Sequence, residues 1–198
     1  MFEIKKLKYN SVLISARSTE VLSKTFIRFQ EYYEGPKYKG KIFTLGQVKE
    51  WYSNKFGADT YYRDWSGYNF PSWVLEPFRK GLFDPLTKEE TIILELFKYR
   101  FDNFYIIGAN DKETIRHELA HALYSYNLNY KKSIDSFCEK YKKELSKLSN
   151  HLIKKGYHKD VVNDEIQAYV TDNDDEFIIK NIDGEIIKKI NQIYKKYK

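Results

Sequence analysis

Residues 117–121 contain two histidines whose spacing could hold a metal ion and a glutamate that could act beside that ion. The segment reads His-Glu-Leu-Ala-His and lies in a stretch with a helical pattern. Residues four apart share one face of a helix, so His117 and His121 can direct both imidazoles at one ion. Glu118 would stand beside that ion as a general base. Zinc lowers the pKa of a bound water molecule toward about 7, and Glu118 could accept its proton.

A catalytic zinc site needs a third protein ligand, and Glu165 is the strongest candidate in the sequence. It belongs to a second helical pattern, Asn-Asp-Glu-Ile-Gln-Ala-Tyr, at residues 163–169. Glu165 and Ala168 share a face of that helix, and the small alanine would let two helices approach closely. The alternative third ligands are Asp164, His158 and His151.

The combination of His-Glu-Leu-Ala-His with a downstream Glu-x-x-Ala helix resembles the gluzincin group of zinc metallopeptidases. In that group the first helix supplies two histidine ligands and the general base, and the later helix supplies a glutamate ligand. Glu165 lies 44 residues after His121, a gap similar to that of the anthrax lethal factor and Pro-Pro endopeptidase type. The resemblance covers about residues 103–172 and departs at Tyr169, where that type has a glutamate. It implies a hydrolase, with Zn²⁺ bound by His117, His121 and Glu165.

The resemblance also implies a catalytic residue that donates a hydrogen bond to the developing oxyanion. In that type of enzyme the donor is a tyrosine about seven residues before the glutamate ligand. This register falls on His158, whereas Tyr157 beside it has the matching side chain, so both stay open as candidates. A metal-binding histidine usually donates its other ring N–H to a nearby acceptor, and the candidates for this role are Asp164, Tyr169 and Asp172.

A short aromatic and β-branched run at residues 103–108 predicts a strand ahead of the histidine helix. In zincins this strand commonly borders the cleft and pairs with extended substrate, so residues 103–107 are expected to do the same. Asn110 or Asp111 can cap the helix that follows, which runs to about Tyr126.

Patterns elsewhere in the chain predict a mixed α+β fold whose C-terminal half is mostly helical. Capping boxes at Thr44 with Gln47 and at Thr87 with Glu90 predict two helix starts. A strand is expected at residues 11–16, and further helices at 18–33, 133–154 with Gly156 ending the helix, 160–170 and from 185 onward. Residues 57–85 are expected to be irregular, with a short turn of helix near 72–79. The expected fold class is therefore α+β and zincin-like, with a small sheet and an HExxH active-site helix.

Composition restricts the class of protein. The chain has 198 residues, 42% hydrophobic and 31% charged, which is typical of a folded globular protein, and we expect one domain over residues 1–198. Residues 103–172 would carry the zinc site, and residues 1–100 match no pattern known to us and could cover a cleft. No apolar stretch suffices to span a bilayer, the start does not resemble a secretory signal, and the single Cys138 excludes an internal disulfide. Together these features favour a cytoplasmic protein.

The formal net charge of +6 comes from lysines spread along the chain, with few arginines. Phosphate recognition favours arginine and clustered basic residues, so nucleic acid is not the expected partner, and no membrane contact is expected. We expect a peptide or protein substrate, cleaved in the manner of an endopeptidase, and the oligomeric state stays open. Two other functions also stay open. One is a catalytically silent or latent zincin-like binding or regulatory protein, and the other is a basic protein associated with nucleic acid.

Overall fold

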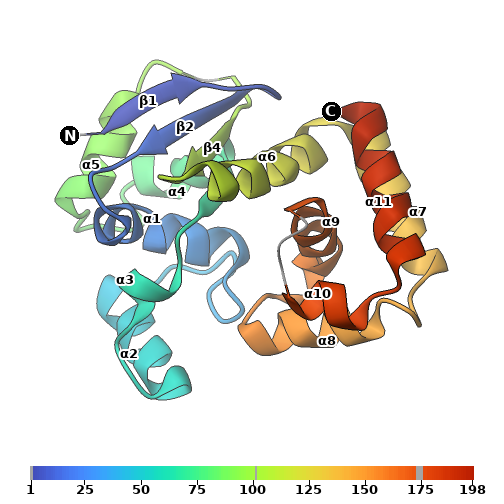
Figure 1. Ribbon diagram of the computed structural model, residues 1–198. Helices are drawn as coiled ribbons and strands as arrows, with labels where there is room; N and C mark the ends of the chain where they lie inside the picture. The colour runs from blue at the N-terminus through green and yellow to red at the C-terminus, as the bar shows by residue number, and fades with distance from the viewer. Residues whose placement is uncertain (1, 101, 173–175) are drawn as a thin grey trace. The chain divides into compact units, whose positions relative to one another are not determined.

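The computed structural model describes residues 2–100, 102–172 and 176–198. The chain divides into two compact units, unit 1 (Met1–Ile115) and unit 2 (Arg116–Lys198), whose elements can be followed by colour in Figure 1. The expected α+β class is confirmed, and the described part of unit 2 is helical, as the patterns indicate. The expectation of a single domain stays a prediction.

Unit 1 is built on a four-stranded mixed sheet. The strand order is β1-β2-β4-β3, in which β2 and β4 run parallel and the two outer pairs run antiparallel. The strands are β1 (Glu3–Lys6), β2 (Ser11–Ser15), β3 (Tyr68–Pro71) and β4 (Tyr105–Gly108). The other elements of unit 1 are α1 (Thr19–Glu34), α2 (Leu45–Phe56), α3 (Tyr61–Asp64), η1 (Ser72–Val74), α4 (Leu75–Arg79) and α5 (Lys88–Leu96).

The strand predicted at residues 103–108 is confirmed as β4, but its expected role at the edge of a cleft is wrong. β4 pairs with β2 on one side and with β3 on the other. Both rows of its backbone groups are therefore already hydrogen-bonded, and it cannot accept an extended peptide by strand addition. The sequence patterns placed β3 in irregular structure, and this unexpected strand covers the edge of β4.

Helix α1 packs on the sheet through large aromatic side chains. Phe26 and Phe29 meet Phe70 of β3, with ring centroids 5.8 and 5.3 Å apart. Gly108 at the end of β4 allows this approach, because a Cβ there would lie 2.6 Å from the Phe26 ring. Both predicted capping boxes are present and start α2 and α5.

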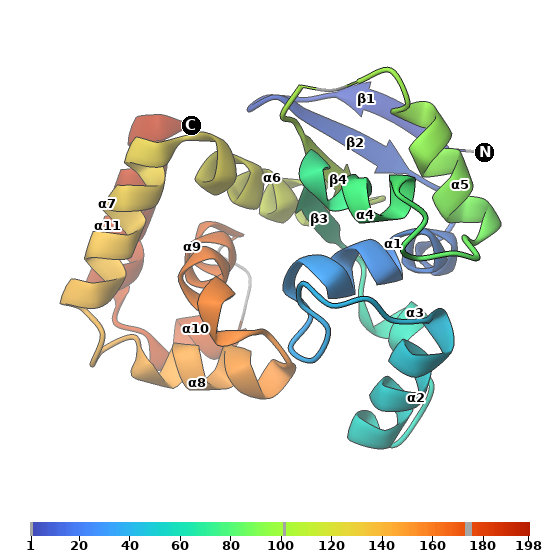
Figure 2. The ribbon, with the colours of Figure 1, turned by 180° about the vertical axis from the view of Figure 1, so that it is seen from behind.

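Unit 2 contains a group of helices around α9. Its elements are most of α6 (Lys112–Tyr126), which crosses the unit boundary, and α7 (Leu128–Lys140), α8 (Ser146–Lys155), η2 (Lys159–Val161), α9 (Val162–Asp172), α10 (Glu176–Asn181) and α11 (Gly184–Tyr197). Figures 1 and 2 show α9 between α8 and the pair formed by α7 and α11. Within the described residues, every helix is too short or too polar to cross a lipid bilayer.

The single helix expected at residues 133–154 is wrong, because α7 and α8 are separate helices joined by a turn. Both helices pack against α9. A straight helix of that length would extend about 33 Å, so it could not fold around the short α9. The predicted helix end at Gly156 is confirmed as the end of α8, since Gly156 adopts a left-handed conformation with φ 115°.

A buried carboxyl in unit 1 gives stability a pH dependence. Glu31 near the end of α1 is 6% exposed. Burial raises the pKa of Glu31 to about 7 from 4.5, although a hydrogen bond from Tyr61 and the charge of Lys55 act in the opposite direction. The folded protein therefore binds the proton of Glu31 more tightly than the unfolded chain does.

We expect the stability that protonated Glu31 contributes to be complete below pH 4.5 and to be lost as the pH rises through about 7. The loss can reach about 1.4 kcal/mol for each pH unit. Glu31→Gln is neutral at every pH, so it should lose less stability than the wild type between about pH 5 and about pH 8. Urea unfolding at the two pH values measures the difference. The control is Glu20→Gln at an exposed site on the same helix, and a Glu31→Gln profile parallel to that of the wild type would contradict the prediction.

Candidate metal centre

One face of α6 carries the first part of the site. Asp111, one of the two predicted caps, starts the helix: its carboxylate accepts hydrogen bonds from the backbone N–H and the hydroxyl of Thr114, both at 2.8 Å. His117 and His121 then lie one turn apart, with ring centroids separated by 4.9 Å. His121 is 2% exposed and Glu118 is 5% exposed, so the helix presents these groups in an environment largely shielded from water.

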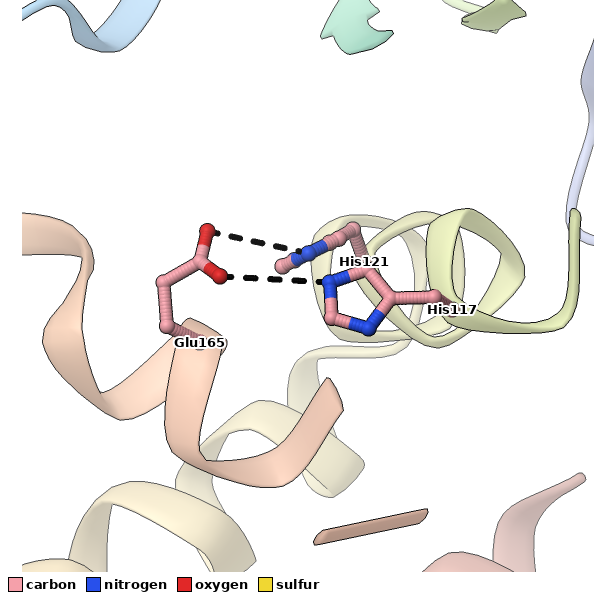
Figure 3. Close-up of side chains that lie close together, drawn as sticks. All are labelled: His117, His121 and Glu165. Carbon is pink, nitrogen blue, oxygen red and sulfur yellow. Dashed lines mark ion pairs between the residues drawn. The ribbon is translucent and has the colours of Figure 1, made fainter. Parts of the chain in front are cut away.

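Helix α9 places Glu165 opposite the two histidines. Ile166 and Ala168 are buried on this helix, and Glu165 itself is 1% exposed. The Glu165 Oε2 atom lies 3.9 Å from His117 Nε2, and its Oε1 atom lies 3.7 Å from His121 Nε2 (Figure 3). The carboxylate and the two imidazoles therefore converge from two helices that are separate in the sequence.

The geometry of these three residues fits a metal ion. One nitrogen or oxygen donor from each of His117, His121 and Glu165 lies within 4.8 Å of the others. The two separations from Glu165, 3.7 and 3.9 Å, are shorter than about 4.2 Å, which is twice a typical zinc–ligand bond. Imidazole and carboxylate donors suit zinc and several other first-row metals, so the donor set describes a metal site without selecting the ion.

The electrostatics of the cluster favour a bound cation. Burial of the His121 ring opposes its protonation, but the carboxylates of Asp164 and Glu165 outweigh burial and raise the pKa of His121 well above its ordinary value. Glu118 contributes to the same shift. Carboxylates that hold a proton on a buried ring also stabilise a divalent cation placed among them.

A chain of hydrogen bonds supports His121 from behind. Its Nδ1–H donates to Asp164 Oδ1 at 2.8 Å, which leaves Nε2 directed toward Glu165. Gln167 Nε2 donates to the same Asp164 oxygen at 2.9 Å, and the Tyr130 hydroxyl donates to Gln167 Oε1 at 2.8 Å. Gln167 and Tyr130 are fully buried. Such a chain holds a metal-binding ring in one tautomer and one orientation.

The sequence patterns do not single out Gln167 or Tyr130. Gln167 follows Asp164 by three residues on one helix, a spacing that allows their side chains to meet. Tyr130 comes from α7, and no local spacing relates it to the other two residues. Only the packing of α7 against α9 brings its hydroxyl to Gln167.

A second polar cluster ties α6 and α7 to the start of α9. The Tyr124 hydroxyl donates to Asp135 Oδ1 at 2.5 Å, and Asn163 Nδ2 donates to the same oxygen at 3.1 Å. Lys131 Nζ lies 3.3 Å from the other Asp135 oxygen. Asn163 is adjacent to Asp164, so this cluster fixes the first turn of α9, which carries the carboxylates of the site.

The alternative ligands predicted from the sequence face other groups. His151 stacks on the Phe177 ring with centroids 3.8 Å apart. His158 caps η2, where its Nδ1 accepts from the Asp160 backbone N–H at 3.3 Å. Asp164 contacts Nδ1 of His121 and so lies behind the ring. The structure therefore brings only Glu165, of the four candidates, into the ligand cluster, and the Asp172 side chain lies outside the described part of the chain.

Of the two oxyanion candidates, Tyr157 is the one connected to the cluster. Its hydroxyl lies 3.0 Å from the Tyr169 hydroxyl, and the Tyr169 ring stands edge-on to His117 with centroids 4.9 Å apart. His158 instead lies 3.4 Å from the Asp160 carboxylate. Tyr157 therefore contacts a residue that touches the cluster, whereas His158 faces the Asp160 carboxylate, and the oxyanion role of either residue stays a prediction.

Comparison with known proteins finds no protein-family model, no curated protein and no solved structure that matches this chain. The resemblance to gluzincins therefore stays a prediction from the motif residues.

We expect Asp164→Asn to weaken metal binding about 10-fold or more, because it removes the charge that orients His121 and raises its basicity. A competition titration with a chromophoric chelator measures this affinity. Asp160→Asn is the matched control, since the Asp160 side chain is 57% exposed and pairs with His158. Equal affinities for Asp164→Asn and the wild type would contradict the role of Asp164, as would an equal loss in the control.

Proposed function

We propose that this protein is a zinc-dependent metallopeptidase of gluzincin type that hydrolyses peptide bonds in a peptide or protein substrate. The observation that supports it most is the convergence of His117, His121 and Glu165, with donor atoms within 4.8 Å of one another. The adjacent Glu118 supports hydrolysis in particular, because a metal-binding site without a catalytic purpose needs no carboxylate at that position.

In this proposal the three residues of the cluster hold the ion, and zinc would supply Lewis-acid activation of a water molecule and of the substrate carbonyl. Glu118 accepts a proton from the attacking water as the bond to the carbonyl carbon forms, and it then delivers that proton to the leaving amine. Its burial keeps the carboxylate away from competing bulk water. Tyr157 donates a hydrogen bond to the carbonyl oxygen as negative charge develops there.

The metal content of the purified, untagged protein tests the ligand set. We expect elemental mass spectrometry to find about one zinc ion per chain, and Glu165→Ala to lose most of it. Glu139→Ala on α7 is the control, because Glu139 is an exposed carboxylate paired with Lys142. Zinc that persists in Glu165→Ala would contradict the assigned ligand, and a different bound metal would contradict the zinc assignment.

Replacement of Glu118 separates binding from catalysis. We expect Glu118→Gln to keep its zinc and to lose hydrolysis by about 10²-fold or more, because the amide cannot accept the proton of the attacking water. Cleavage of a peptide library, followed by mass spectrometry, measures the activity. Full hydrolysis by Glu118→Gln would overturn the mechanism. A zinc-loaded wild type that cleaves nothing would favour the silent binding protein.

A further inference from the structure

Tyr169 occupies the position at which the chain departs from the gluzincin pattern, and it touches the cluster. It follows Glu165 by four residues, so both side chains lie on one face of α9. Its ring stands edge-on to the His117 ring, with centroids 4.9 Å apart and an interplanar angle of 82°. Tyr169 thus contacts one metal-binding side chain directly.

The hydroxyl of Tyr169 reaches the segment that follows α8. Gly156 ends α8 in a left-handed conformation, and the turn brings Tyr157 back toward α9. The two phenol hydroxyls lie 3.0 Å apart, and their rings meet at 83°. Lys155, on the other side of Gly156, places its ammonium 4.8 Å from the centre of the Tyr169 ring. Both tyrosines are only partly buried, so a ligand can reach this edge of the site.

We infer that Tyr169 is a positioning residue for Tyr157, an inference that rests on the proposed function. The two hydroxyls lie within hydrogen-bond distance of one another. In the substrate complex the Tyr169 hydroxyl is the donor of this bond, and the Tyr157 hydroxyl in turn donates to the carbonyl oxygen of the peptide substrate. If Tyr157 donated to Tyr169 instead, its single hydroxyl proton would be used in that bond and could not be donated to the substrate carbonyl.

Two physical effects strengthen Tyr157 as a donor in this arrangement. Hydrogen bonds in series polarise one another, so a phenol that accepts a bond donates a stronger one. The Lys155 ammonium over the Tyr169 ring draws electron density from that phenol, which favours donation by its hydroxyl. The contact of Tyr169 with His117 anchors the pair beside the cluster, and the bond between hydroxyls then determines where Tyr157 points.

The test uses full-length protein loaded with Co²⁺ and titrated with acetohydroxamate, followed by the visible absorption of the cobalt. Tyr157→Phe should weaken hydroxamate binding about 10-fold, the effect of losing a hydrogen bond to a charged group. Tyr169→Phe keeps the ring against His117 and should weaken the same binding about 3-fold to 10-fold. The double variant should bind hydroxamate no more weakly than Tyr157→Phe alone, because Tyr169 acts only through Tyr157. Co²⁺ affinity should be the same in all of them.

The control is Tyr141→Phe, another partly buried tyrosine in unit 2, whose hydroxyl accepts from Lys189 at 3.3 Å. It should bind hydroxamate as the wild type does. Three results would each overturn the inference and leave the proposed function standing. They are unchanged hydroxamate binding in Tyr169→Phe, a loss of hydroxamate binding from Tyr169→Phe that is equally large in the Tyr157→Phe background, and a lowered Co²⁺ affinity in Tyr169→Phe. A wild type that binds no Co²⁺, or a Co²⁺ form that binds no hydroxamate, would overturn the proposed function itself, and the inference with it.

Discussion

The carboxylate of Glu165 is almost completely removed from water, at 1% exposure, and faces two imidazoles. Burying an isolated carboxylate costs several kcal/mol of solvation free energy, so nearby protons or cations must offset this cost. Here the ring of His121 takes up a proton readily, because the surrounding carboxylates raise its pKa. The same charge balance is satisfied when a divalent cation replaces the proton, and the remaining features of unit 2 serve to keep these groups facing one another.

Two sets of polar contacts hold α6, α7 and α9 so that the groups of the cluster face one another. Asp164 and Gln167 link His121 to Tyr130 of α7, and Asp135 receives hydrogen bonds from α6 and from Asn163 at the start of α9. In the first set His121, Gln167 and Tyr130 are buried and Asp164 is partly buried, and all four are hydrogen-bonded, which makes the arrangement specific as well as stable. A change in any one partner would leave another buried group unsatisfied, so these residues position the site although they do not face the ligand cluster.

A buried ion pair in unit 1 shows how a structural charge differs from this cluster. Arg28 and Glu90 are 3% and 0% exposed, and the guanidinium donates two hydrogen bonds to the carboxylate. The Glu90 carboxylate also accepts from the Thr87 backbone N–H at 2.8 Å, and Arg28 donates to the Phe83 carbonyl. Opposite permanent charges neutralise one another there, so no further ion is needed. The His117, His121 and Glu165 cluster instead combines one carboxylate with two imidazoles, a donor set that suits a metal ion.

Local patterns were sufficient for features that depend on neighbours along the chain. The spacing of His117 and His121, the cap at Asp111 and the left-handed end of α8 at Gly156 follow from helix geometry alone, because every relevant atom is within a few residues. Glu165 could be selected from the sequence because it has a helical pattern of its own. The break between α7 and α8, the interior place of β4 and the contact of Tyr130 with Gln167 depend on which elements pack together. Packing brings together residues that are far apart in the sequence and have no characteristic spacing. Only the tertiary structure therefore decided these three features.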